Sequence, residues 1–309
     1  MTNLPPAPQQ GQRPTGLTIL KSMLASPSVE QQFKNCLNDN APAFTASIID
    51  LYNSDSNMQL CEPKAVIMEA LKAATLKLPI VKALGYAFVI PYSNSVKNAD
   101  GSWSKVATPT FQMGYKGYIQ LAQRTGQYET INADCVYEGE LRKACKLTGE
   151  IDLDGEKTSN TIIGYFAYIK LKTGFAKTLY MTVEQMANHA KRFSKGLDKD
   201  TTVDKLIALA NIPIATEKAV GWKGNFHGMA LKTVIRLLLS KYGYLSIEMQ
   251  QAVTNDDTAD VVDTETGEVI AKGGTPTVVD LKDTEYMEVK DAQKPVEPEA
   301  KPADDGPGF

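Results

Sequence analysis

The segment Phe111–Gln127 constrains the fold of this chain more than any other, because it joins a strand pattern directly to a helix pattern. Its residues read FQMGYKGYIQLAQRTGQ. A run of alternating polarity ends at Gly114, and two glycines then bracket Tyr115 and Lys116. In helical steps from Lys116, polar side chains fall on one side and apolar side chains on the other. The segment therefore predicts a strand, a tight turn and an amphipathic helix with a strongly polar face.

This polar face has the chemistry of an anion-binding surface. The side chains that share it are those of Lys116, Gln120, Gln123, Arg124 and Gln127. A helix that starts near Gly114 points its free backbone N–H groups towards the region that Lys116 approaches, and glycine allows a chain of phosphates to come close. We therefore interpret the segment, including Gln112 and Tyr115, as a candidate site for a nucleic-acid backbone.

The charge of the chain is divided between a basic body and an acidic tail. The 309 residues carry a formal charge of −3 at pH 7. Residues 1–250 contain 28 Lys and Arg against 21 Asp and Glu, a net +7, whereas residues 251–309 contain 5 against 15, a net −10. A basic body is compatible with binding a polyanion. Charge alone, however, favours the simpler interpretation of a solvated surface with a solubilising tail.

Bulk composition predicts a soluble globular protein. Its hydrophobic content of 43% is enough for a core, and no apolar run approaches the roughly 20 residues that cross a bilayer. The four cysteines stand far apart and form no C-x-x-C pair, which indicates neither a disulfide framework nor a zinc site. They are Cys36, Cys61, Cys135 and Cys145.

Periodicity predicts an α+β fold with N-terminal helices, a central antiparallel β-sheet and hairpin with packed helices, and a disordered acidic C-terminal tail. The expected helices lie at 17–24, 28–37, 43–52, from Pro63 onward, after Gly114, over 182–194 and over 228–240. The expected strands lie at 85–92, 106–113 and 129–137 and in a hairpin over 161–181. We divide the chain into a disordered lead (1–16), a folded domain (17–250) and the acidic tail (251–309).

Two of the later helices carry clustered basic residues. Lys191, Arg192 and Lys195 gather at the end of one, and Lys232 and Arg236 share a face of the other, four residues apart. Adjacent cations on one helix repel each other by on the order of a few tenths of a kcal/mol. A shared external anion or buried carboxylates would explain the pair, and an ordinary wet surface is the simpler alternative.

Aromatic residues accompany these cations, as in proteins that stack single-stranded bases on rings. Phe111 and Tyr115 lie beside Lys116, Phe193 lies beside Arg192, and Trp222 lies beside Lys223. For Phe111 and Phe193 we favour a core position, whereas Trp222, in a glycine-flanked loop, is equally consistent with the core and with stacking.

Catalysis finds little support in the sequence. There is no G-x-x-x-x-G-K-[ST] loop for ATP, and the two histidines, His189 and His227, lie near no serine-elbow signature. The acidic run from Glu150 to Glu156 could be a magnesium site for a nuclease. Within it, however, Asp154-Gly155 is a strong hairpin-turn pair, which favours one wet face of a ribbon. We expect no catalytic residue, cofactor or resident metal, and a Mg²⁺ dependence of DNA binding is not indicated.

These segments resemble the RecT family of phage single-strand annealing proteins. In chain order the resemblance is carried by MLASPSVEQQF from Met23, CEPKAVIMEALKAATLKLPI from Cys61, LGYAFVIPY from Leu84, GYKGYIQLAQRTGQ from Gly114 with VYEGE after it, HAKRFSKG from His189, and the stretch Trp222–Gln250. It covers most of residues 20–250 and leaves the lead and the acidic tail outside. It therefore implies that DNA binding, annealing and oligomerisation belong to the domain 17–250.

The resemblance implies an ATP-independent protein, without a hydrolytic site, that binds single-stranded DNA and anneals complementary strands into a duplex in phage homologous recombination. It further implies a homo-oligomer in the form of a ring or helical filament, a phage exonuclease as partner, and a cytoplasmic location in a bacterial host cell. Members of the wider group share a β-hairpin and helix core that lays DNA in a basic groove across subunits.

Carried onto this chain, the resemblance places the groove candidates in three blocks. They are Lys116 and Arg124, then Lys191, Arg192 and Lys195, then Lys223, Lys232 and Arg236, with Gln112, Tyr115 and Trp222 beside them. Some relatives have a second basic residue directly after the position of Arg236, where Leu237 stands here. The expected contacts at that end therefore do not transfer residue by residue.

Two alternatives from other classes are a magnesium-dependent nuclease and a protein-interaction scaffold that ignores DNA. The tail ends in Asp304–Phe309, which joins two acids to a terminal aromatic and is a candidate docking peptide for a basic, apolar-floored pocket. We consider host single-strand-binding machinery as a partner of this tail.

Replacing both Lys116 and Arg124 by alanine should lower the affinity for single-stranded DNA uniformly across sequences, because phosphate contacts carry no base readout. The slope of log K against log salt should flatten by about 0.7 for each phosphate that is no longer neutralised. Filter binding across a salt series measures this slope, and an unchanged slope would contradict the assignment.

Overall fold

The computed structural model describes residues 15–97, 101–194, 197–198, 200–212, 221–244, 246–257, 261–262 and 269–271. The chain divides into two compact units, residues 1–273 and 274–309, and every described residue belongs to the first. The predictions for the lead up to residue 14, for Lys195 and for the tip Asp304–Phe309 lie outside the described residues.

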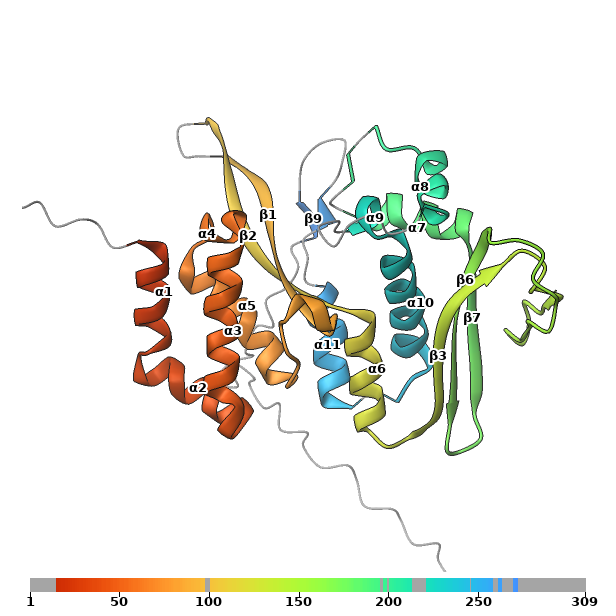
Figure 1. Cartoon of the computed structure of the whole chain (residues 1–309), viewed down its shortest axis with the longest axis horizontal. Coiled ribbons are helices and arrows are strands. Elements are labelled where there is room, and N and C mark those ends of the chain that lie inside the picture. Colours follow the sequence, from red (N-terminus) through yellow and green to blue (C-terminus); the bar gives the residue numbers. More distant parts are fainter. Residues whose placement is uncertain are drawn as a thin grey trace, which may run out of the picture. The chain divides into compact units, whose positions relative to one another are not determined.

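Helices form the described chain up to residue 84. They are α1 (Gly16–Leu24), α2 (Pro27–Leu37), α3 (Ala41–Ser54), α4 (Ser56–Gln59) and α5 (Pro63–Thr75), with the 3-10 turns η1 (Asn38–Asn40) and η2 (Lys82–Leu84) (Figure 1). Proline occupies the first turn of α2, α3 and α5, where its missing N–H costs nothing. The small residues Ala70, Ala73 and Ala74 are fully buried on α5, which contacts α1, α2 and α3. The expected helices are confirmed, and α4 is an addition.

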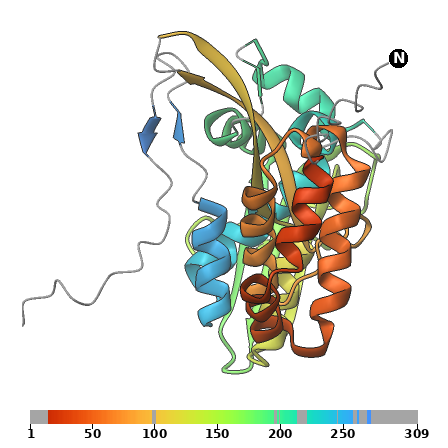
Figure 2. The same ribbon diagram turned by 90° about the vertical axis from the view of Figure 1, so that its left-hand side faces the viewer.

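The next element is a long two-stranded antiparallel ribbon of β1 (Ala87–Lys97) and β2 (Trp103–Met113). Its base is tied to α5, because the backbone N–H of Phe111 donates to Glu69 Oε2 at 2.7 Å, while Lys72 Nζ donates to the other oxygen of Glu69 at 2.8 Å. Phe111 is buried there, as predicted. Figure 2 shows the other end of the ribbon reaching beyond the helices, and Trp103 near that end is 66% exposed.

A second sheet lies further along the chain. Its strands β3 (Tyr128–Tyr137), β6 (Ile162–Leu171) and β7 (Ala176–Thr182) pair antiparallel in the order β3-β6-β7. The remaining elements are α6 (Tyr115–Arg124), β4 (Lys143–Ala144), β5 (Ile151–Asp152), α7 (Val183–Phe193), α8 (Val203–Ala210), α9 (Gly221–Gly224), α10 (Phe226–Tyr242), α11 (Ile247–Asp257), β8 (Val261–Val262) and β9 (Val269–Ala271).

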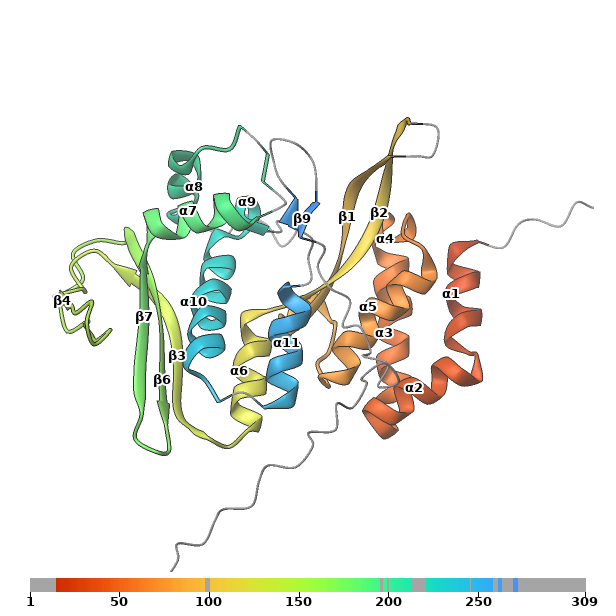
Figure 3. The same cartoon turned by 180° about the vertical axis from the view of Figure 1, so that it is seen from behind.

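Helix α10 is the centre of this half of the fold. It packs on all three strands of the second sheet and against α6, while α11 lies beside α6 (Figures 1 and 3). A helix with neighbours on several sides has a wide apolar surface. Accordingly, Ala230, Val234, Ile235, Leu238 and Leu239 of α10 are fully buried.

The α+β class is confirmed, with local corrections. The strands form separate sheets rather than one continuous sheet, because β1 and β2 pair only with each other. The acidic run does not turn at Asp154-Gly155: β4 pairs with β5, and the chain reverses between Cys145 and Glu150, whose backbone groups bond at 2.8 Å. Helix α11 continues to Asp257, past the expected start of the tail at residue 251.

The two glycines of the GYKG turn, Gly114 and Gly117, pack closely against the backbone of an earlier segment of this chain. A Cβ atom on Gly114 would lie 2.0 Å from the carbonyl oxygen of Gly85, and one on Gly117 would lie 2.2 Å from that of Tyr86. The N–H of Gly114 also donates to the Tyr86 carbonyl at 2.9 Å. The interpretation that these glycines admit a nucleic-acid backbone is therefore wrong, since the segment before β1 occupies that space.

Replacing Gly114 by alanine should destabilise the fold by about 3 kcal/mol or more, because the clash is with backbone that cannot rotate away. The φ angle of Gly114, −85°, suits any residue, so the effect is steric. Gly174 is the matched control: its φ of 89° disfavours alanine by about 1 kcal/mol, but no atom lies within 4 Å of the added Cβ. Urea unfolding measures both variants, and equal losses of stability would contradict the steric explanation.

Candidate nucleic-acid interface

Helix α7 presents its basic residues at an exposed end. The capping box predicted at its start is present: Gln185 N–H donates to Thr182 Oγ1 at 3.1 Å, and Thr182 N–H donates to Gln185 Oε1 at 3.0 Å. The buried face of α7 carries Val183, Met186, Ala187 and Ala190. With the start and the inner face set in this way, Lys191 and Arg192 are left exposed in the last turn.

The fold brings this end of α7 close to α10. The pKa of His189 on α7 is lowered by burial first, and then by the positive charges of Arg236 on α10 and Arg192 on its own helix. A charge acts on a pKa in this way only over a short range. Two basic groups that are far apart in the sequence therefore both act on one imidazole. Lys232, one turn before Arg236, is half-buried on α10.

Phe193 completes this group, and the prediction of a core position for it is wrong. Its side chain is 62% exposed. The ring centroid lies 4.6 Å from that of His189, with the planes tilted by 42°, and the guanidinium carbon of Arg192 lies 5.3 Å from the Phe193 ring. We call His189, Arg192, Phe193 and Arg236 the α7–α10 cluster. It combines cations with an accessible aromatic surface.

Three candidates of the central block lie at the end of β2 and the start of α6. Lys116 is exposed, and its Cδ would lie 3.6 Å from a Cβ on Gly85. Gln112 is half-buried, with Nε2 donating to the hydroxyl of Tyr92 at 2.6 Å. Tyr115 is partly buried against the hydrophobic core. Lys116 is therefore the member of this set with its charge in solvent.

Arg124 has a structural role that the sequence did not reveal. Helix α5 ends in a Schellman motif in which Lys77, at φ 54°, stands where glycine is usual: its N–H donates to Ala74, and the N–H of Leu78 donates to Ala73. Arg124 Nη1 donates to the Leu76 carbonyl at 2.8 Å, and Nη2 donates to the Lys77 carbonyl at 3.0 Å. The guanidinium thus holds the end of α5 as well as lying at the surface.

An acid also lies near Arg124. The pKa of Glu248 on α11 is lowered, first by hydrogen bonds from its own backbone N–H and from Ser246, and further by the charges of Lys77 and Arg124. A carboxylate within range competes with any phosphate for the same cation. Replacing Lys116 and Arg124 together should therefore change the stability of the fold as well as the affinity for DNA, and both quantities need to be measured.

The candidates around α9 are engaged within the protein. Trp222 is 5% exposed and packs edge-on against Phe226, with ring centroids 5.1 Å apart and planes at 68°. Little of its ring is available for stacking in this conformation. Lys223 Nζ pairs with Asp198 Oδ2, and both side chains are exposed. Such a surface pair is weak and exchanges readily with another anion.

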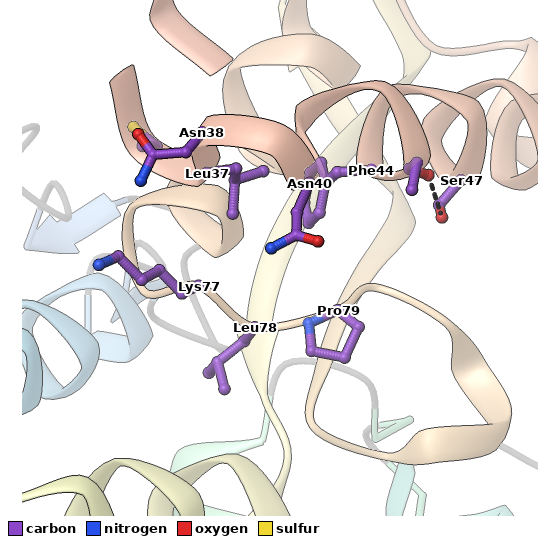
Figure 4. A pocket seen from close by; sticks show the side chains of 10 residues that line it. Leu37, Asn38, Asn40, Phe44, Ser47, Lys77, Leu78 and Pro79 are labelled. Atoms are coloured by element: carbon purple, nitrogen blue, oxygen red, sulfur yellow. Dashed lines mark hydrogen bonds between the residues drawn. The ribbon is translucent and has the colours of Figure 1, made fainter. Parts of the chain in front are cut away.

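A separate pocket lies among the N-terminal helices (Figure 4). Its volume is about 440 Å³, and it is lined by Cys36, Leu37, Asn38, Asn40, Ala43, Phe44, Ser47, Lys77, Leu78 and Pro79. Its walls come from α2, η1, α3 and the segment after α5, so it shares no lining residue with the α7–α10 cluster. Lys77 is the one charged residue in this lining.

Metal-binding clusters and membrane-spanning helices are both absent from the part of the chain that the structure describes. Within it, no three His, Cys, Asp or Glu side chains gather closely enough to hold a metal ion, and this includes the acids between Glu150 and Glu156. Among these same residues, no helix combines the length and the apolarity that crossing a bilayer requires.

Comparison with known proteins identifies the family. Residues 42–270 match the sequence model of the RecT family. The chain is 41% identical over 303 residues to the Bacillus subtilis (strain 168) protein named "Uncharacterized protein YqaK", covering 98% of this chain and 90% of that one. It is 29% identical over 204 residues to Protein RecT of Escherichia coli (strain K12), covering 64% of each chain.

Replacing His189 by glutamine should remove an acid sensitivity of the fold. Because the folded-state pKa lies below the unfolded value of about 6.5, the unfolded chain takes up the proton first. The free energy of unfolding of the wild type should therefore fall, relative to the variant, as pH drops through 6.5, and the difference should be constant at higher pH. Urea unfolding between pH 5.5 and 8 tests this, and parallel pH curves would show that the pKa of His189 is not lowered in the folded chain.

Proposed function

The chain belongs to the RecT family, and on that basis we propose that it anneals complementary DNA strands without ATP, as an oligomeric ring or helical filament. Membership implies single-strand annealing in recombination. Members of the family bind single-stranded DNA and self-associate. The finer statements about ATP, ring and filament are our proposal for this chain.

The observation that carries the DNA-binding assignment is the exposed end of α7, where the Arg192 guanidinium carbon lies 5.3 Å from the exposed ring of Phe193. Arg192 and Arg236 both act on His189, and Arg192 is exposed beside Lys191. Basic groups that gather in a folded protein against their mutual repulsion are stabilised when an anion is shared between them. A phosphate backbone supplies such anions at regular intervals.

The remaining site residues are assigned by their exposure and by the contacts that they make within the protein. Lys116 is our best candidate on α6, and Lys223 is a candidate that would exchange Asp198 for a phosphate. Lys191 and Lys232 extend the α7–α10 cluster along its two helices. Arg124 contributes to the same surface only in addition to capping α5.

Annealing follows from contacts of this kind. Lys and Arg hold backbone oxygens without reading sequence, which leaves the base edges free to test an incoming strand. Ionic contacts also exchange quickly, so a mismatched pairing can be released and another tested. No covalent step is needed, and the proposed mechanism requires neither a nucleophile nor a nucleotide.

The assembly and its surroundings are also proposals. We place self-association in the helices before Leu78, where Leu60 is 74% exposed and Met68 is 53% exposed. We propose a phage exonuclease as the supplier of single strands, and the cytoplasm of the bacterial host as the location.

One experiment separates this function from a nuclease and from a scaffold. Purified protein is mixed with complementary oligonucleotides that carry a fluorescence donor and acceptor, with and without Mg²⁺ and in the absence of ATP. Energy transfer that rises faster than in buffer, with the strands intact on a gel, supports annealing. Shortened strands indicate a nuclease, and no change indicates a scaffold.

Replacing Arg192 by alanine and Arg236 by glutamine should slow annealing and flatten the slope of log K against log salt by about 1.4, since each phosphate contact contributes about 0.7 to that slope. The matched control replaces Arg142 and Lys143, two exposed cations at and before β4, by alanine and should leave both quantities unchanged. Thermal unfolding confirms that the variants are folded. An unchanged slope in a folded Arg192 and Arg236 variant would contradict the site.

A further inference from the structure

We propose that Phe193 is a base-stacking residue of the α7–α10 cluster, on which one base of a bound single strand lies while the neighbouring cations hold its phosphates. This inference rests on the proposed function, since it names the contact made with the bases. Base stacking on aromatic rings tolerates any sequence, because every base has a π-face. It therefore suits a protein that must hold strands of all sequences.

Exposure selects Phe193 among the aromatic residues that flank the predicted basic groups. Phe111 is 2% exposed and Trp222 is 5% exposed, so their rings belong to the core, and Tyr115 is partly buried. Phe193 is 62% exposed at the last position of α7. It lies three residues after the buried Ala190 and seven after the buried Met186, so its exposure follows from its place at the end of the helix and not from the face that it occupies.

The Phe193 ring is held in place by its neighbours. The imidazole of His189, one turn earlier, lies 4.6 Å away between centroids, and the Arg192 guanidinium carbon lies 5.3 Å from the ring. An aromatic side chain has only two rotatable bonds, so two such neighbours leave it little freedom to lose on binding. A base laid on the free surface of the ring would therefore meet a side chain that is already held in position.

The charges around Phe193 favour a nucleic acid over a protein as the occupant. Lys191 and Arg192 directly precede the ring and are exposed on its own helix, and the charge of Arg236 on α10 acts on the neighbouring His189. An aromatic ring surrounded by cations matches a base followed by its phosphates. A second copy of the chain is the other occupant that the experiment must distinguish.

The test compares two strands of equal length and charge, oligo-dT and a strand built from abasic residues. Replacing Phe193 by alanine should weaken binding to oligo-dT by about 5- to 150-fold, the range for loss of one stacked base. Binding to the abasic strand should be unchanged, because only phosphates are held there. Replacing Phe193 by tryptophan should restore the affinity for oligo-dT, and the added fluorescence should be quenched by oligo-dT and not by the abasic strand.

Phe175 provides the matched control, since it is an exposed phenylalanine (45%) between β6 and β7, and its replacement by alanine should change neither affinity. The inference is overturned if the Phe193 variant binds oligo-dT like the wild type, or if it loses affinity equally for both strands. It is also overturned if sedimentation without DNA shows dissociation, because a second copy would then cover the ring. The proposed function fails separately, if the wild type binds neither strand.

Discussion

The close packing of the GYKG turn against the segment before β1 is the contact on which the arrangement of this fold depends. The N–H of Gly114 bonds to the Tyr86 carbonyl, and neither Gly114 nor Gly117 has room for a side chain. This contact sets the direction in which α6 leaves β2. Helix α6 then packs against α10, which covers the β3-β6-β7 sheet, so one backbone contact links the ribbon to the second half of the fold.

Electrostatics separates the basic residues of this chain into two kinds. Arg124 is a cation with partners of its own, because two carbonyls at the end of α5 and the nearby Glu248 already balance it. Arg192 instead lies exposed at the end of α7 beside the Phe193 ring, and its charge adds, with that of Arg236, to the burial that lowers the pKa of His189. A cation held by backbone carbonyls stabilises a fold, whereas an exposed cation attracts an external anion.

Local patterns predicted the elements well and the exposure of single side chains less well. The capping box at Thr182 predicted the start of α7 correctly, because both of its hydrogen bonds form within one turn. Phe193 was assigned to the core and lies in solvent, and Trp222 was equally consistent with both and is buried. The hairpin turn expected at Asp154-Gly155 formed between Cys145 and Glu150 instead, since the pairing of β4 with β5 prevailed over local turn preference.

The sequence by itself determined the α+β class, most helix and strand positions, the three basic blocks and the family, because each of these depends on residue type, periodicity or similarity along the chain. Only the tertiary structure decided which basic blocks meet, which arginine caps a helix, and what the glycines of the GYKG turn admit. These outcomes are interactions between residues far apart in sequence, as between His189 and Arg236 or between Arg124 and Leu76. The packing of whole helices determines such contacts, and a local pattern does not contain that information.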